Sequence, residues 1–170
     1  MNNKYQSSGA LAYWIIGLIT VAVLALIIVL AFTNSPASLS SKTNREVALT
    51  CTTDMATQFH IHPVLKIVIN GQPQEIPADI GIKPNCMNSL HTHDATGIIH
   101  VEASEKRDFT LADFFAVWDK VYNKNQIFDY KTDENHVIRQ TVNGKEAEDF
   151  ENTVLKDKDE IIIYYEEKKS

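Results

Sequence analysis

A long apolar run dominates the start of the chain. Residues 11–32, LAYWIIGLITVAVLALIIVLAF, carry no charge, and only Gly17 and Thr20 interrupt the apolar pattern. At about 1.5 Å per residue, a helix of this length crosses a hydrocarbon core of roughly 30 Å. A cleaved signal peptide is the alternative, but its apolar region is normally about 7–15 residues long. The pattern therefore predicts a transmembrane helix at 11–32, preceded by a short tail at 1–10.

The next segment, 33–45, has almost nothing to bury. Its sequence, TNSPASLSSKTNR, is dominated by Ser, Asn, Thr and Pro, a composition that is typical of a flexible stalk. A folded domain is expected at 46–167, where β-rich runs and one amphipathic segment occur, followed by a solvated tail at 168–170.

Short β-rich runs recur along this domain. Val64–Ile69 is followed by Asn70-Gly71, the dipeptide that is typical of a tight hairpin. A return strand is expected at 74–80, where Pro77 favours an edge position. Three further runs are predicted as strands: 98–102, 137–142 and 160–165.

One segment has the pattern of an amphipathic helix. Thr110 and Asp113 have the spacing of a capping box, in an acidic variant, so the helix is expected to begin after Thr110. The apolar positions that follow fall on one helical face: Leu111, Phe114, Phe115, Trp118, Val121 and Tyr122. The predicted fold class is therefore α+β, a small mixed-sheet domain with one main helix after the N-terminal transmembrane helix.

This order of strands around a single helix resembles the β-grasp fold. Val142-Asn143-Gly144, followed by LKDKDEI at 155–161, is similar to the last hairpin and strand of ubiquitin-like sulfur carriers. Those carriers end in Gly-Gly, whereas this sequence ends in charged residues and Ser170. The resemblance implies a β-grasp-like fold and not the sulfur-transfer function.

Five of the six histidines lie between residues 60 and 100. Four of them form two His-x-His pairs, His60/His62 and His91/His93. The fifth begins a His-x-Glu pair, His100/Glu102. In an extended strand, residues i and i+2 point to the same face. Each pair is therefore expected to present two potential metal ligands together.

The 89–102 segment predicts how two of these pairs meet. Residues 94–97, Asp-Ala-Thr-Gly, are a turn signal between two short extended runs. A hairpin with an even-length turn places His91 opposite His100, with His93 on the same face. Three imidazoles that converge on one ion, with one position left open, are the ligand set of a catalytic zinc site, and imidazole also binds copper, iron and nickel. The sequence therefore predicts a transition-metal site, with zinc or copper favoured.

The other candidates would complete or orient this site. His60 and His62 could supply further ligands or form a second site. Glu102 could be a ligand or, like Asp94, a hydrogen-bond partner that fixes the orientation of an imidazole. Solvated surface histidines without a metal are the alternative, and His136 is expected to be of that ordinary kind.

Cys51 and Cys86 are the two cysteines of the chain and lie 35 residues apart. A disulfide is favoured if the domain lies in an oxidising compartment. The alternative is that Cys86, which is close in sequence to the histidines, acts as a soft metal ligand.

Positive charge does not decide the orientation of the predicted membrane helix. Lys4 lies on one side of it, and Lys42 and Arg45 lie on the other. The positive-inside rule therefore favours neither orientation. The uncharged stalk, together with the cysteine and histidine usage, favours a short cytoplasmic tail. The expected location is the cell membrane, single-pass, with the C-terminal domain outside the cytoplasm.

A further resemblance covers most of residues 51–170. The stretch CTTDMATQFHIHPVLKIVING…IPADIGI…C…LHTHDATGIIHVE…FTLADFFAVW resembles an uncharacterised family of small, single-pass, membrane-anchored bacterial and archaeal proteins with an HTHD-x-x-GIIHVE core. The resemblance supplies no activity. It implies that one set of residues belongs to a family pattern: His60, His62, Cys86, His91, His93, Asp94, His100 and Glu102.

The formal net charge of −6 argues against a nucleic-acid partner, because an acidic domain repels phosphate backbones. The favoured function is a membrane-anchored, extracytoplasmic metal-binding module that captures, senses or delivers a metal, with the membrane and another membrane or extracytoplasmic protein as partners. One alternative is a hydrolase or hydratase with a three-histidine metal site. Another is a structural or interaction module without a metal. The sequence contains no H-E-x-x-H, P-loop or nucleophile-elbow motif, which favours a binder over an enzyme.

Overall fold

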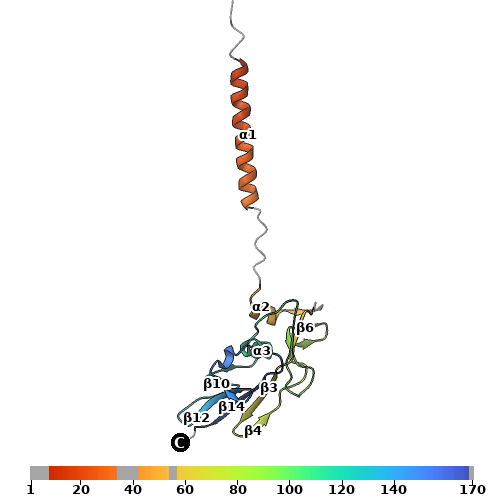
Figure 1. The fold of residues 1–170 in the computed structure, drawn as a ribbon, viewed down its shortest axis with the longest axis vertical. Helices are drawn as coiled ribbons and strands as arrows, with labels where there is room; N and C mark the ends of the chain where they lie inside the picture. Colours follow the sequence, from red (N-terminus) through yellow and green to blue (C-terminus); the bar gives the residue numbers. More distant parts are fainter. Residues whose placement is uncertain (1–7, 34–41, 54–56, 169–170) are drawn as a thin grey trace, which may run out of the picture. The chain divides into compact units, whose positions relative to one another are not determined.

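The computed structural model describes residues 8–33, 42–53 and 57–168, and the chain divides into two units, residues 1–41 and 42–170 (Figure 1). In the first unit, helix α1 spans Ser8–Thr33. Its described side chains, residues 13–28, are exposed. Within the part of the chain that the structure describes, no helix combines the length and apolarity needed to cross a membrane. Most of the predicted stalk, residues 34–41, lies outside the described residues.

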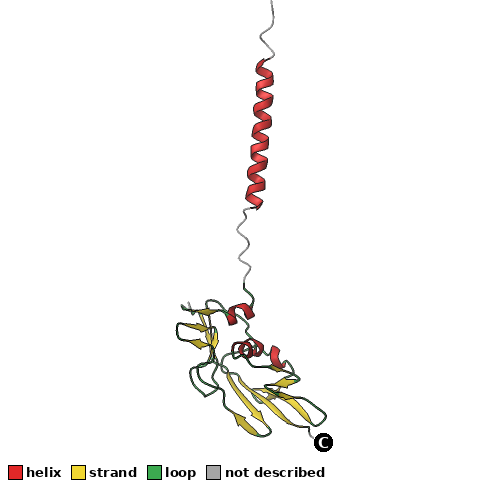
Figure 2. Ribbon diagram, turned by 180° about the vertical axis from the view of Figure 1, so that it is seen from behind, coloured by secondary structure: helices red, strands yellow, loops and turns green. Residues whose placement is uncertain are grey.

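The second unit is a mixed α+β domain whose largest sheet has the strand order β13-β12-β14-β3-β4. The strands span Val64–Ile69 (β3), Gln72–Gln74 (β4), His136–Val142 (β12), Lys145–Glu146 (β13) and Glu160–Glu167 (β14). The central pair, β3 and β14, is parallel, and the other pairs are antiparallel. Figure 2 shows the longer strands of this sheet at the end of the domain where the C-terminus lies. The predicted mixed sheet is therefore present.

The predicted hairpin after β3 is confirmed, but its return strand is shorter than expected. Asn70 and Gly71 both adopt positive φ angles, 50° and 78°, as a two-residue hairpin turn requires. The prediction of a strand over 74–80 was wrong, because β4 ends at Gln74. The chain then leaves the sheet to bury Ile76, which is 3% exposed, and Pro77 has no backbone N–H to continue the ladder.

The predicted helix forms as α3, Leu111–Val117. The Asp113 carboxylate accepts hydrogen bonds from the backbone N–H and the hydroxyl of Thr110, at 3.0 and 3.1 Å, so the capping box is confirmed. The expected end of the helix was wrong, because Asp119 adopts a left-handed φ of 57° and stops it. Tyr122 consequently lies in strand β9 and not on the helical face.

Among the residues of the domain that the structure describes, three small sheets and two short helices accompany the main sheet and α3. One sheet contains β1 (Cys51–Thr52), β6 (Cys86–Asn88) and β5 (Ile82–Lys83); another contains β11 (Tyr130–Lys131), β10 (Gln126–Ile127) and β9 (Tyr122–Asn123); the third contains β2 (Phe59–Ile61), β8 (His100–Ala103) and β7 (Leu90–His91). The helices are α2 (Asn44–Leu49) and the 3-10 turn η1 (Phe150–Asn152). The predicted strand at 98–102 begins later, as β8, because Ile98 pairs with Val64 of β3 instead.

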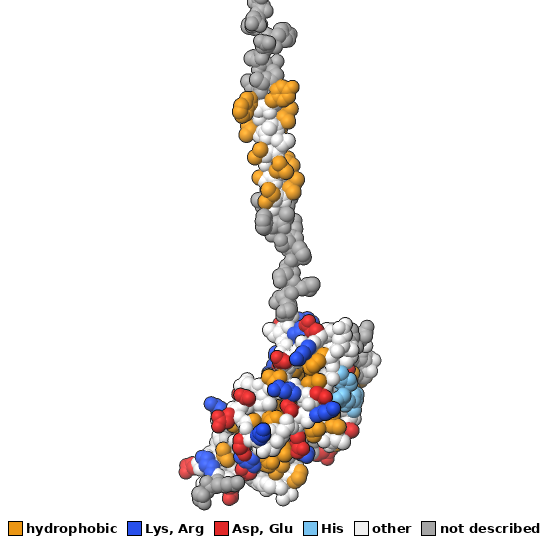
Figure 3. Space-filling view, viewed as in Figure 1, with side chains coloured by type: hydrophobic (Ala, Val, Ile, Leu, Met, Phe, Trp, Pro, Cys, Tyr) orange, Lys and Arg blue, Asp and Glu red, His pale blue; other side chains and the backbone are white. Residues whose placement is uncertain are grey.

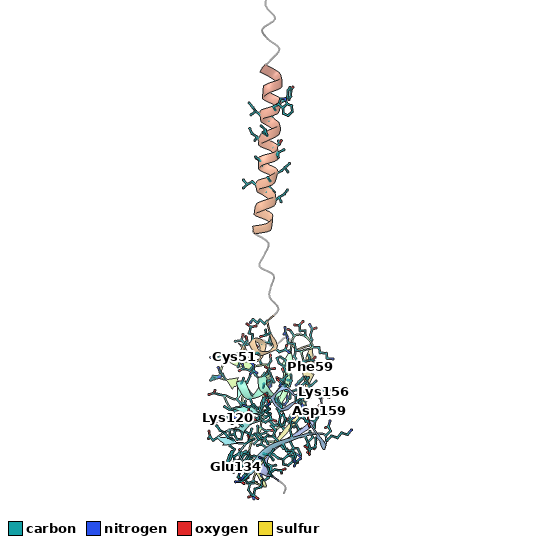
Figure 4. The ribbon with its side chains drawn as sticks, turned by 90° about the vertical axis from the view of Figure 1, so that its left-hand side faces the viewer. Cys51, Phe59, Lys120, Glu134, Lys156 and Asp159 are labelled. Carbon is teal, nitrogen blue, oxygen red and sulfur yellow. A yellow bond between two sulfur atoms is a disulfide. The ribbon has the colours of Figure 1, made fainter. Side chains whose placement is uncertain are left out.

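Cys51 of β1 and Cys86 of β6 form a disulfide, as predicted. Figure 4 places Cys51 and Glu134, which lies two residues before β12, at opposite ends of the domain. The bond occupies the Cys86 thiol, so the alternative role of Cys86 as a soft metal ligand is wrong.

A single apolar core joins α3 to the main sheet and to the small sheets. Phe114 and Phe115 of α3 are 0% and 1% exposed, and they belong to the same buried cluster as Leu65 and Ile67 of β3 and Ile163 of β14. Leu90 and Val101, the apolar neighbours of His91 and His100, are also fully buried. The core therefore holds the β7–β8 hairpin by its apolar residues.

Gly97 allows the loop before β8 to approach β3 closely. Its backbone carbonyl accepts a hydrogen bond of 2.9 Å from the Leu65 N–H. Its φ is +82°, and a Cβ at this position would overlap the Leu65 carbonyl oxygen. We therefore expect Gly97→Ala to lower the free energy of unfolding by about 2–4 kcal/mol, from the left-handed conformation and the overlap together.

Gly71→Ala is the matched control for this prediction. Gly71 has a similar φ of +78°, but an added Cβ would meet nothing within 4 Å. This variant should lose about 1 kcal/mol, from the backbone conformation alone. Equal losses in the two variants, measured by denaturant unfolding, would contradict the close approach of Gly97 to β3.

Candidate metal centre

Strand β8 lies between β2 and β7 and brings the three histidine-containing pairs side by side. His91 of β7 pairs with His100 of β8, which confirms the predicted register. On the other edge of β8, His60 of β2 pairs with Glu102. Figure 3 shows histidine side chains as one patch on the domain surface.

His91, His93 and His100 form the first group that could hold a metal ion. Their candidate ligand atoms lie within 4.8 Å of one another. The ring centroids are 4.8 Å apart for His91 and His93, 4.5 Å for His93 and His100, and 5.4 Å for His91 and His100. Nitrogen ligands of tetrahedral zinc lie about 3.3 Å apart, so modest rotations of these side chains would complete the coordination geometry. The predicted convergence of these three histidines is therefore present.

His91 is the buried member of this group, with 0% exposure. Its Nδ1 lies 3.0 Å from the backbone carbonyl oxygen of Asn88. A carbonyl can only accept a hydrogen bond, so Nδ1 carries the hydrogen and, in the neutral ring, Nε2 holds a lone pair. Nε2 is buried and has no hydrogen-bond partner among the described residues. Metal-binding histidines usually donate their other N–H to such an acceptor, which fixes the tautomer.

Burial keeps the His91 ring neutral. It lowers the pKa of His91 to about 4, against a smaller raising effect from the hydrogen bond to Asn88 and from the Glu102 carboxylate. The pKa of His100 is also lowered, first by burial and then by its positive neighbour His93 when that ring is protonated. Neutral imidazole is the form that binds a metal, so both rings are available as ligands near neutral pH.

His60, His62 and His100 form a second group, with ligand atoms again within 4.8 Å of one another. His60 Nε2 lies 3.3 Å from His100 Nδ1. The His60 and His62 rings have centroids 4.3 Å apart. Their side chains are 40% and 43% exposed, in contrast to the buried His91. The second group is therefore the outer part of the cluster, and His100 belongs to both groups.

The Glu102 carboxylate lies between the two groups. Its Oε1 is 3.2 Å from His60 Nε2 and 3.9 Å from His91 Nε2. Its Oε2 accepts a hydrogen bond of 3.1 Å from the Thr57 hydroxyl. This position suits a carboxylate that orients an imidazole or neutralises charge close to an ion.

The Asp94 carboxylate stabilises the turn at 94–97 and does not have the predicted role of orienting an imidazole. Its Oδ1 accepts hydrogen bonds from the hydroxyl and the backbone N–H of Thr96, and these two bonds hold its pKa below the ordinary value. His93 and His100 are close enough to lower that pKa slightly further. Asp94 therefore contributes negative charge beside the cluster.

Asp157 and Asn88 are two contributors that the sequence analysis missed. Asp157 Oδ1 accepts a hydrogen bond of 3.0 Å from the His62 backbone N–H and lies 3.9 Å from His62 Nδ1. Asp157 contacts His62 from 95 residues away, and Asn88 contacts His91 through a backbone carbonyl, so neither contact is indicated by a side-chain motif. His136, predicted to be ordinary, lies elsewhere: its Nδ1 is 3.0 Å from Asp133, and its ring stacks on Tyr165.

Comparisons of the chain with protein-family models, with curated proteins and with solved structures find no match. The assignment of a function therefore depends on the geometry and chemistry of these residues.

Proposed function

We propose that the domain binds a transition-metal ion, zinc or copper, through His91, His93 and His100. Its role would be to capture, sense or deliver that metal, and a second membrane or extracytoplasmic protein would be the partner in delivery. Three histidine ligands leave a coordination position for water or for a ligand from such a partner.

The buried Nε2 of His91 is the observation that carries this proposal. Leaving a buried polar atom unsatisfied costs about 1–3 kcal/mol. A metal ion between His91, His93 and His100 would use that lone pair, whereas the hydrogen bond to Asn88 prevents the ring from simply turning over. Incidental surface histidines would instead hydrogen-bond to water.

We also propose that residues 11–32 anchor the chain in a cell membrane, with the domain outside the cytoplasm. The support is the uncharged apolar run of the sequence and the Cys51–Cys86 disulfide, since disulfides persist in oxidising compartments. Protease added to intact cells should remove the domain at 42–170. Complete protection until the cells are lysed would contradict this orientation.

The fold of the domain is proposed to be β-grasp-like. The support is the sheet order β4-β3-β14-β12-β13, in which β3 and β14, the first and last strands of this sheet in sequence, form a parallel central pair. Helix α3 lies in sequence between the two hairpins of this sheet, β3–β4 and β12–β13, as in the resemblance described above.

The proposal is tested by the effect of zinc on unfolding. An ion that binds the folded state stabilises it by about 2.7 kcal/mol at 100 times its dissociation constant. Adding Zn²⁺ to the metal-free full chain in detergent, produced without a histidine tag, should raise its unfolding temperature, and a chelator should reverse the shift. The shift should shrink at acid pH and be lost as the pH approaches about 4, the lowered pKa of His91, because protons then compete for its imidazole nitrogen. An unchanged unfolding temperature at saturating Zn²⁺ would contradict metal binding.

A further inference from the structure

His100 belongs to both histidine groups, and we propose that the cluster is a two-ion centre in which His100 is the shared ligand. The inner ion would be held by His91 and His93, and the outer ion by His60 and His62. This inference rests on the proposed metal binding and goes beyond it by assigning a second ion and a bridging residue.

The orientation of the His100 ring supports a shared role. Its Nδ1 lies 3.3 Å from His60 Nε2, a separation that two nitrogen ligands of one tetrahedral ion have, at about 3.3 Å. Nδ1 is therefore placed for the outer ion. The other ring nitrogen, Nε2, is assigned to the inner ion, beside the His93 ring at a centroid distance of 4.5 Å.

The two histidine groups also differ in solvent exposure, which is consistent with two separate ion sites. The His91 side chain is 0% exposed, whereas those of His60 and His62 are 40% and 43% exposed. The outer ion would exchange with solvent more readily than the inner one. Two clearly separate environments are harder to reconcile with five histidines sharing one ion, because zinc normally has four ligands.

Negative charge around the cluster matches two divalent ions. Glu102 lies between the groups, 3.2 Å from His60 and 3.9 Å from His91. Asp157 lies 3.9 Å from His62, and Asp94 interacts electrostatically with His93 and His100. These carboxylates reduce the repulsion between two nearby cations. When both nitrogens of His100 bind ions, the ring gives its N–H proton to water and becomes an anionic imidazolate, which adds a further negative charge.

Zinc stoichiometry tests this inference directly. The untagged full chain in detergent is loaded with Zn²⁺, freed of unbound metal and analysed for zinc per chain. The wild type should hold two ions. The His60→Ala/His62→Ala double variant should hold one, and so should His93→Ala, whose side chain is exposed and whose loss leaves the core intact. His136→Ala, at a histidine outside the cluster, should still hold two.

The outcomes separate the two proposals. No bound zinc in the wild type would overturn the proposed function itself. One zinc per wild-type chain would overturn the two-ion centre and leave the three-histidine site in place. Two ions in the His60→Ala/His62→Ala variant would also overturn the assignment of the outer ion.

Copper provides the test of the shared ligand. Two Cu²⁺ ions bridged by one imidazolate couple magnetically, so the paramagnetic resonance signal per copper should be smaller in the wild type than in the His60→Ala/His62→Ala variant. The expected loss is most of the integrated intensity. Two bound coppers with the full intensity of isolated ions would overturn the bridge through His100.

Discussion

Zinc affinity is expected to fall by more than about 100-fold in His100→Ala, since the loss of even an outer partner of a metal ligand costs about 10–100-fold. His100 supplies a ligand atom to both histidine groups. Its replacement leaves His91 and His93 on one side and His60 and His62 on the other, with no group of three. Competition with a colorimetric chelator measures the affinity.

His136→Ala is the control for this variant. His136 is a partly buried histidine of the same domain, with its own carboxylate partner Asp133, but it lies outside both groups. Its loss should leave zinc affinity within a factor of two. Equal affinities in wild type and His100→Ala would show that zinc, if bound, is held elsewhere.

Removal of the disulfide is expected to have the largest effect on stability. The chain-entropy relation gives about 4 kcal/mol for a loop of this size, because Cys51 and Cys86 are 35 residues apart. We expect the Cys51→Ser/Cys86→Ser double variant to lose about that much free energy of unfolding. Denaturant unfolding of the metal-free protein, with wild type in oxidised form, measures the loss.

The same variant should also weaken zinc binding, because the disulfide segment positions His91. Strand β6 continues from Cys86 to Asn88, whose carbonyl oxygen holds His91 Nδ1 at 3.0 Å. The Asn88 amide in turn donates to the Ala48 carbonyl oxygen at 2.8 Å. An unfolding free energy equal to that of wild type would contradict the stabilising role of the bridge. Unchanged zinc affinity in the folded variant would contradict its role in positioning His91.

The features that could be predicted from the sequence are local ones. The pairing of His91 with His100 follows from the strand period of two and from an even-length connection, although this connection, residues 92–99, is longer than a tight turn. The start of α3 follows from the three-residue spacing of Thr110 and Asp113. In each case the interacting residues are close enough in the chain for a turn or a single helical turn to determine their geometry.

The features that could not be predicted depend on long-range packing or on one backbone conformation. β2 joins β8 across about 40 residues of chain, with no turn to set its register, and the pairing of His60 with Glu102 follows from it. Asp157 reaches His62 from 95 residues away. Val121 and Tyr122 continue the apolar helical period, but the left-handed Asp119 ends α3 before them.

Anomalous X-ray scattering from crystals of the zinc-loaded protein tests the central claim most directly. We expect a zinc peak among His91, His93 and His100, with His91 Nε2 at about 2.0–2.1 Å from the ion and Nδ1 still bonded to Asn88. Crystals that contain zinc but show no peak within bonding distance of His91 Nε2 would contradict the claim.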